Sequence, residues 1–159
     1  MCGQRPTPEQ LLTTVQHRLS DAVRSSLHRA HAIYSETVDD TRAESWVSFH
    51  LVTSPSSHAR VEIVVVDDRF GFIANDASLY LDRIAWGDDA VAWIRTCVEV
   101  LDALLASDLR IRVRKTLFGR RTGAVWIPAR NGGWNGDLVA CRGRGEEKVF
   151  PRPWFDTSS

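Results

Sequence analysis

LRIRVRKTLFGRRTGAVWIP, residues 109–128, is the stretch of sequence that decides the fold. Apolar and basic residues alternate along its first limb, with Leu109, Ile111 and Val113 in the apolar positions. Alternation with a period of two is typical of a β-strand that has one buried face and one solvated face. Gly119 and Gly123 supply turn residues before the second limb, which ends in Ala-Val-Trp-Ile-Pro. The stretch therefore predicts a β-hairpin whose apolar face packs on the core.

Six cations and no acid occupy this hairpin, so it is the local feature that most suggests a partner. The cations are Arg110, Arg112, Arg114, Lys115, Arg120 and Arg121. One hypothesis is that they contact an anionic partner, with nucleic acid as the obvious class. The alternative is an ordinary solvated strand face whose arginines pair with acids on neighbouring strands.

The charge of the chain is unevenly distributed, although its formal net charge is zero. Residues 1–108 hold 9 Lys and Arg against 16 Asp and Glu, whereas residues 109–159 hold 11 against 4. Such a split indicates either a basic surface for an anionic partner or acidic elements lying beside basic strands.

Length and composition indicate one folded domain. The chain has 159 residues, of which 43% are apolar, and this length suits a single core. Three cysteines without metal or redox spacing, and no apolar run of about 18 residues, predict a soluble cytoplasmic protein. We predict flexible tails at residues 1–7 and 156–159 around a single domain at 8–155.

Two segments show helical periodicity. The first, residues 8–30, has Thr7 as its predicted cap and a single apolar stripe. The second, residues 88–106, follows Gly87 and is apolar around most of its circumference, which predicts a helix buried across the sheet. Residues 35–44 carry four acids and no apolar period, so we expect a connecting loop there.

The remaining strands are predicted from alternation or β-branched composition at 46–53, 61–66, 72–74, 137–141 and 148–150. Residues 67–71 are expected to reverse the chain, and residues 79–86 fit neither period. Runs of strands separated by one helix favour an α+β fold with a mainly antiparallel sheet of about five to seven strands.

No catalytic residue, cofactor site or metal site is predicted. The chain has no nucleophile elbow and no paired-cysteine or zinc-helix motif. His28 and His31 lie three residues apart without a third ligand, so we interpret them as solvent-facing. Cys97 lies in an apolar helical pattern and is expected to be a core residue.

Aromatic residues near the C-terminus are the predicted interface of the protein with a partner. They are Trp134, Phe150, Trp154 and Phe155. The alternative is that residues 149–155 fold back and cap the sheet. Three further tryptophans lie in apolar patterns and are predicted to be core residues: Trp46, Trp86 and Trp93.

These features favour a non-enzymatic binding or adaptor protein. It is expected to engage another protein, or a second copy of itself, through its sheet face and its aromatic C-terminal segment. A nucleic-acid-binding protein that uses residues 110–121 is the first alternative, and a small enzyme without a recognisable motif is the second. No membrane partner is expected.

Overall fold

The computed structural model describes residues 13–39, 41, 43–53, 59–75, 77–115, 121–126 and 146–158. Its elements are α1 (Thr14–Arg29), β1 (Tyr34–Asp39), β2 (Trp46–Leu51), β3 (Val61–Val65), β4 (Arg69–Ala74), β5 (Ala77–Asp82), the 3₁₀ helix η2 (Arg83–Trp86), α2 (Ala90–Leu105), β6 (Leu109–Lys115), β7 (Arg121–Trp126) and β8 (Glu146–Phe150). The described strands form one sheet in the order β1-β2-β3-β4-β5-β7-β6-β8. Neighbours are antiparallel except β5 and β7. The α+β class and the mainly antiparallel sheet are therefore confirmed.

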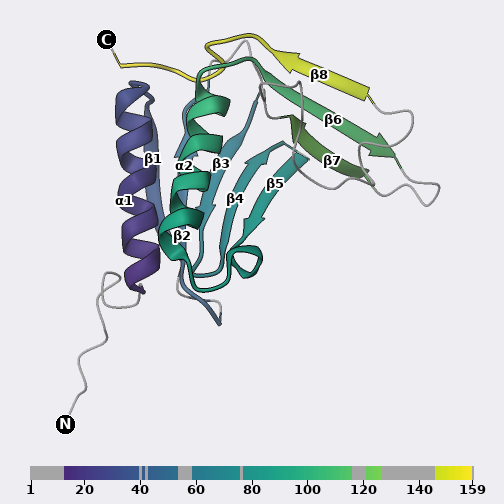
Figure 1. Cartoon of the computed structure of the whole chain (residues 1–159). Helices are drawn as coiled ribbons and strands as arrows, with labels where there is room; N and C mark the ends of the chain where they lie inside the picture. The colour runs from purple at the N-terminus through teal and green to yellow at the C-terminus, as the bar shows by residue number, and fades with distance from the viewer. Residues whose placement is uncertain are drawn as a thin grey trace.

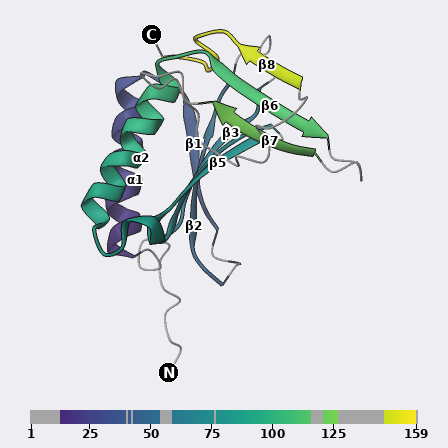
Figure 2. The same ribbon diagram turned by 45° about the vertical axis from the view of Figure 1, so that its right-hand side comes forward.

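The two helices lie side by side on one face of the sheet (Figure 1). Figure 2 shows this layer over β1 to β5, while β6, β7 and β8 extend beyond the helices. The core lies between helices and sheet, where Leu19, Phe49, Phe72 and Leu101 are fully buried. The opposite face of the sheet is covered by neither helix.

α1 begins later than the sequence indicates. Thr13 caps it: the Thr13 hydroxyl accepts from the Gln16 backbone N–H at 3.2 Å, and the Gln16 side chain accepts from the Thr13 backbone N–H. This reciprocal capping box satisfies two of the free donors at the helix start. The predicted cap at Thr7 is therefore wrong for this helix, and residues 1–12 lie outside the described part. Leu19 and Val23 of the predicted stripe are buried as expected.

α2 forms within the predicted residues 88–106. The Asp89 carboxylate accepts from the Ala92 backbone N–H at 3.0 Å and so caps the first turn. Trp93 is fully buried, and its indole N–H donates to the Leu81 carbonyl at 3.3 Å, which fixes α2 against β5. Cys97 is also fully buried, as predicted for a core thiol.

The expected loop at residues 35–44 is wrong for residues 35–39, because Tyr34–Asp39 forms edge strand β1. Only Tyr34 and Val38 of this strand are large and apolar, and both are only half-buried, so the apolar period is weak. Pairing with β2 supplies the hydrogen bonds, and the Tyr34 ring lies 5.9 Å from that of Phe49. Glu36 is hydrogen-bonded to Arg24 of α1, which raises the pKa of that guanidinium. With β1, the strands in the described part of the chain number eight, where the sequence predicts about five to seven.

The other strand predictions agree with the structure where it describes them. β2, β3 and β4 form the expected meander, and β4 already begins at Arg69 within the predicted reversal. The segment that fitted neither period divides into β5 and η2, which explains its mixed pattern. The strand expected at 148–150 is confirmed as β8, and the one expected at 137–141 lies outside the described residues.

The end of the chain, Pro151–Ser158, forms a segment that we call the C-terminal strap. Trp154 is fully buried and Phe155 is 5% exposed. The Trp154 indole N–H donates to the backbone carbonyls of Leu104 at 3.3 Å and Ser107 at 3.2 Å, at the end of α2. The strap therefore caps the sheet and a helix end at once.

The strap continues to the first strand of the sheet. Thr157 forms a β-bridge with Ala32, and the Ser158 backbone N–H donates to the His31 carbonyl at 2.8 Å. The Asp156 backbone N–H also donates to the Val52 carbonyl at 2.8 Å. The prediction of a flexible tail from residue 156 is therefore wrong for residues 156–158, because pairing with remote backbone orders them.

Candidate functional site: two surface patches

The basic hairpin forms as predicted, with β6 paired to β7 from Arg110 opposite Trp126 to Lys115 opposite Arg121. Register places Arg110 and Arg112 on the face of the sheet that the helices leave uncovered, because Leu109 and Ile111 point into the core. The structure gives only the backbone positions of Arg114, Lys115 and Arg121, and Arg120 lies outside the described residues.

The two described arginines share one carboxylate. Glu147 of β8 lies 3.9 Å from a guanidinium nitrogen of Arg110 and 3.9 Å from one of Arg112. The acid therefore comes from the neighbouring strand β8 and not from the acidic residues 1–108. A pair this long and this exposed contributes little to stability.

Val149 completes this surface, which we call the β6–β8 patch: Arg110, Arg112, Glu147 and Val149. Val149 lies opposite Arg110 in the register and is 46% exposed. The Arg110 side chain is 58% exposed and that of Arg112 is 28% exposed. The patch thus places an exposed apolar side chain next to the exposed guanidinium of Arg110 on strands β6 and β8.

The predicted aromatic interface is not brought together on the surface. Trp154 and Phe155 are core residues, and their rings contact each other at a centroid distance of 4.8 Å. Phe150 is half-buried and packs against the core, while Trp134 lies outside the described residues. Of the two alternatives for this segment, folding back to cap the sheet is the one the structure shows.

A second surface was missed by the sequence reasoning. Ile84 and Trp86 of η2 and Val91 of α2 are 89%, 40% and 52% exposed. We call these three residues the corner patch, because they lie where the chain turns from β5 into α2. The prediction that Trp86 is a core residue is therefore wrong. None of the four side chains of the short 3₁₀ helix between Asp82 and Gly87 is buried.

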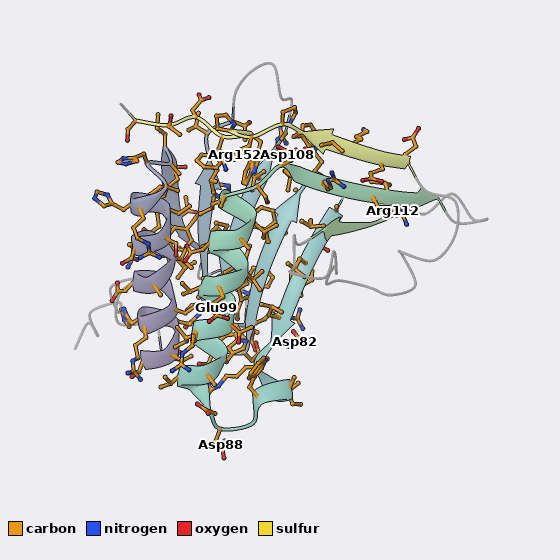
Figure 3. All side chains as sticks on the ribbon, turned by 45° about the horizontal axis from the view of Figure 1, so that its top comes forward. Asp82, Asp88, Glu99, Asp108, Arg112 and Arg152 are labelled. Atoms are coloured by element: carbon orange, nitrogen blue, oxygen red, sulfur yellow. The ribbon has the colours of Figure 1, made fainter. Side chains whose placement is uncertain are left out.

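Three acidic residues lie near η2. Asp82 pairs with Arg69 at 3.0 Å, and Asp67 lies 3.8 Å from Arg83. Asp88 is exposed, and Figure 3 shows it at the tip of the loop before α2, below Asp82. The exposed apolar side chains of this region are therefore followed in the chain by an exposed acid. The nearby pair Gly87-Asp88 is the sequence signal that the preceding residues lie at a surface turn.

A cavity of about 310 Å³ lies between the C-terminal ends of α1 and α2 and the strap. The charged side chains that line the cavity already form contacts within the fold. Arg29 pairs with Asp102 at 3.2 Å, and Arg152 donates from its guanidinium to the Ala106 carbonyl at 2.8 Å. The Arg152 backbone N–H also donates to the Asp108 carboxylate at 2.8 Å, and Figure 3 shows these two residues next to each other. We therefore interpret this cavity as a junction of structural elements.

Titratable groups do not form a metal centre in the part of the chain that the structure describes. His28 and His31 are both exposed, in agreement with their interpretation as solvent-facing residues. Burial raises the pKa of the Cys97 thiol to about 12, so this cysteine stays protonated and unreactive at neutral pH.

Among the described helices, neither is long and apolar enough to cross a membrane. Comparison with known proteins found no match: no family model, no curated protein and no solved structure resembles this chain.

Proposed function

We propose that this protein is a non-enzymatic binding module that engages another protein chain. Its contact surfaces are the corner patch and the uncovered sheet face at the β6–β8 patch, in place of the aromatic C-terminal segment. The observation that supports this most is the exposure of Ile84, at 89% of its surface. Isoleucine is among the residues most often fully buried, and Trp86 and Val91 in the same part of the chain are exposed as well, which supports a contact site here.

The energetic argument concerns the corner patch. Complete burial of a large apolar side chain contributes about 1.5–3 kcal/mol. Scaled by the exposed fractions of Ile84, Trp86 and Val91, covering the patch contributes about 4 kcal/mol. Tryptophan is also the residue type most enriched among side chains that dominate binding energy. Trp93 of α2 is fully buried and anchors the helix that carries Val91 in the core.

The β6–β8 patch favours a protein partner over nucleic acid. Glu147 lies between Arg110 and Arg112 and would repel a phosphate that approached either guanidinium. An exposed apolar side chain next to arginines is instead common at protein interfaces, where arginine is enriched.

Site-specific photo-crosslinking tests this function. Ile84 is replaced by a photoreactive phenylalanine in the full chain, which is irradiated in cells that produce the protein naturally. We expect a discrete protein adduct at position 84 that disappears when Trp86 is also replaced by serine. The matched control is the same photoreactive residue at Val52, which is 43% exposed on a different surface. Equal adducts at both positions, or none at position 84, would overturn the proposal.

A further inference from the structure

We propose that the partner of the corner patch is a second copy of this chain, which contributes its β6–β8 patch in a head-to-tail contact. This inference rests on the proposed function and adds the identity of the partner. The two patches are complementary in both of the properties that govern an interface, namely apolar exposure and charge.

The complementarity follows from named side chains. The corner patch presents Ile84, which is 89% exposed, and exposed Asp88 follows in the loop that joins η2 to α2. The β6–β8 patch presents Val149 with Arg110 beside it, and the Arg110 side chain is 58% exposed. Apolar groups therefore face apolar groups, and an acid faces an arginine. Such a contact would also place part of the acidic residues 1–108 of one copy against part of the basic residues 109–159 of another.

The contact cannot form within one chain. β5 pairs with β7 only at Ala77 and Ser78, and from there β5 runs away toward η2. The run from Ser78 to Asp82 covers about 13 Å of extended strand. Figure 3 shows Asp88 at the lower end of the molecule and Arg112 on the strands at its upper right. The two patches must therefore meet between molecules.

Two different patches make the contact heterologous. After one contact forms, the pair keeps one free corner patch on one copy and one free β6–β8 patch on the other, so the assembly grows head to tail unless a ring closes. Each contact is small and partly electrostatic, which predicts weak association that rises with protein concentration and falls with salt.

Sedimentation velocity of the purified full chain tests this inference over a wide concentration range at low and at high salt. We expect concentration-dependent association that weakens in salt. Ile84→Asp should weaken it more than tenfold, whereas Val52→Asp, a control with similar surface chemistry elsewhere, should leave it unchanged. Circular dichroism confirms that each variant is folded.

A charge swap identifies the partner surface. Asp88→Lys and Arg110→Glu each reverse one side of the contact, so each variant alone should associate roughly tenfold more weakly. An equal mixture of the two variants should recover association, because each reversed patch then meets its complement on the other variant. Failure of the mixture to recover association would overturn the head-to-tail contact.

The outcomes separate this inference from the proposed function. A chain that stays monomeric at every concentration, while position 84 still forms a Trp86-dependent adduct with a different protein, overturns self-association and leaves the binding function in place. If the chain self-associates and Ile84→Asp does not weaken this association, the role of the corner patch is overturned both in self-association and in the proposed function.

Discussion

Replacing Trp154 with alanine should destabilise the protein severely, because this side chain joins the strap to the core. Trp154 is fully buried, and its ring lies 6.0 Å from that of Phe72 and 4.8 Å from that of Phe155. Truncating a buried tryptophan to alanine costs about 3–5 kcal/mol. Loss of the indole N–H leaves the carbonyls of Leu104 and Ser107 without this donor, at a cost of about 1 kcal/mol.

The expected loss is therefore about 4–6 kcal/mol of unfolding free energy, a large part of the roughly 5–15 kcal/mol available to a domain. Urea denaturation followed by far-ultraviolet circular dichroism measures it, and the melting temperature should fall by roughly 10–20 °C. Trp154→Phe keeps an aromatic ring without the donor and should lose an intermediate amount.

Trp86→Ala is the matched control, because Trp86 is 40% exposed and lies in η2. It should cost below about 1 kcal/mol, as is usual at exposed positions. If Trp154→Ala costs no more than Trp86→Ala, the strap is not part of the core and the aromatic segment is again available as an interface. Deletion of residues 149–159 should unfold the protein for the same reason.

Three further predictions concern other parts of the molecule. Gly71→Ala should lower the free energy of unfolding by about 1–2 kcal/mol in urea denaturation, because its new Cβ would lie 2.7 Å from the Tyr80 ring. Tyr80→Ser should relieve most of that cost, and equal costs with and without Tyr80→Ser would contradict the prediction. The Cys97 thiol should resist alkylation at pH 8 until the protein unfolds, since its pKa of about 12 leaves roughly one thiolate in ten thousand, and mass spectrometry of the labelled peptide would show any earlier reaction. We expect no salt-dependent binding of single-stranded oligonucleotide to the chain. Binding that the double variant Arg110→Glu, Arg112→Glu abolishes would instead support the nucleic-acid alternative.

The sequence predicted those elements whose burial is decided by their own pattern. In β2, β3 and β6 one side of the strand is apolar, and α2 is apolar around most of its surface, so each element carries its signal locally. The same reasoning could not find β1, since much of its stabilisation comes from elements outside its own pattern, through pairing with β2 and through Arg24 of α1.

The candidate sites were harder to predict, because exposure depends on contacts that are remote in sequence. Trp154 meets Leu104, which lies 50 residues earlier in the chain, and so an aromatic in a proline-rich tail became a core residue. Trp86 lies in an equally apolar segment, yet η2 leaves it exposed. Composition could not distinguish these two tryptophans, because their partners come from the tertiary fold. The partner of Arg110 and Arg112 was likewise a carboxylate on a neighbouring strand, as one alternative held, but the strand was β8.

Hydrogen–deuterium exchange at low and high protein concentration tests the central claim most directly, because it locates the contact on the folded chain. The backbone bonds that end η2 are long, with the Gly87 N–H 3.4 Å from the Ile84 carbonyl and the Asp89 N–H 3.3 Å from that of Trp86. These amides should exchange quickly in the monomer. At high concentration we predict slower exchange in residues 83–91 and in 146–150, with the strap unchanged. Exchange in residues 83–91 that does not respond to concentration, or protection confined to other surfaces, would contradict the account.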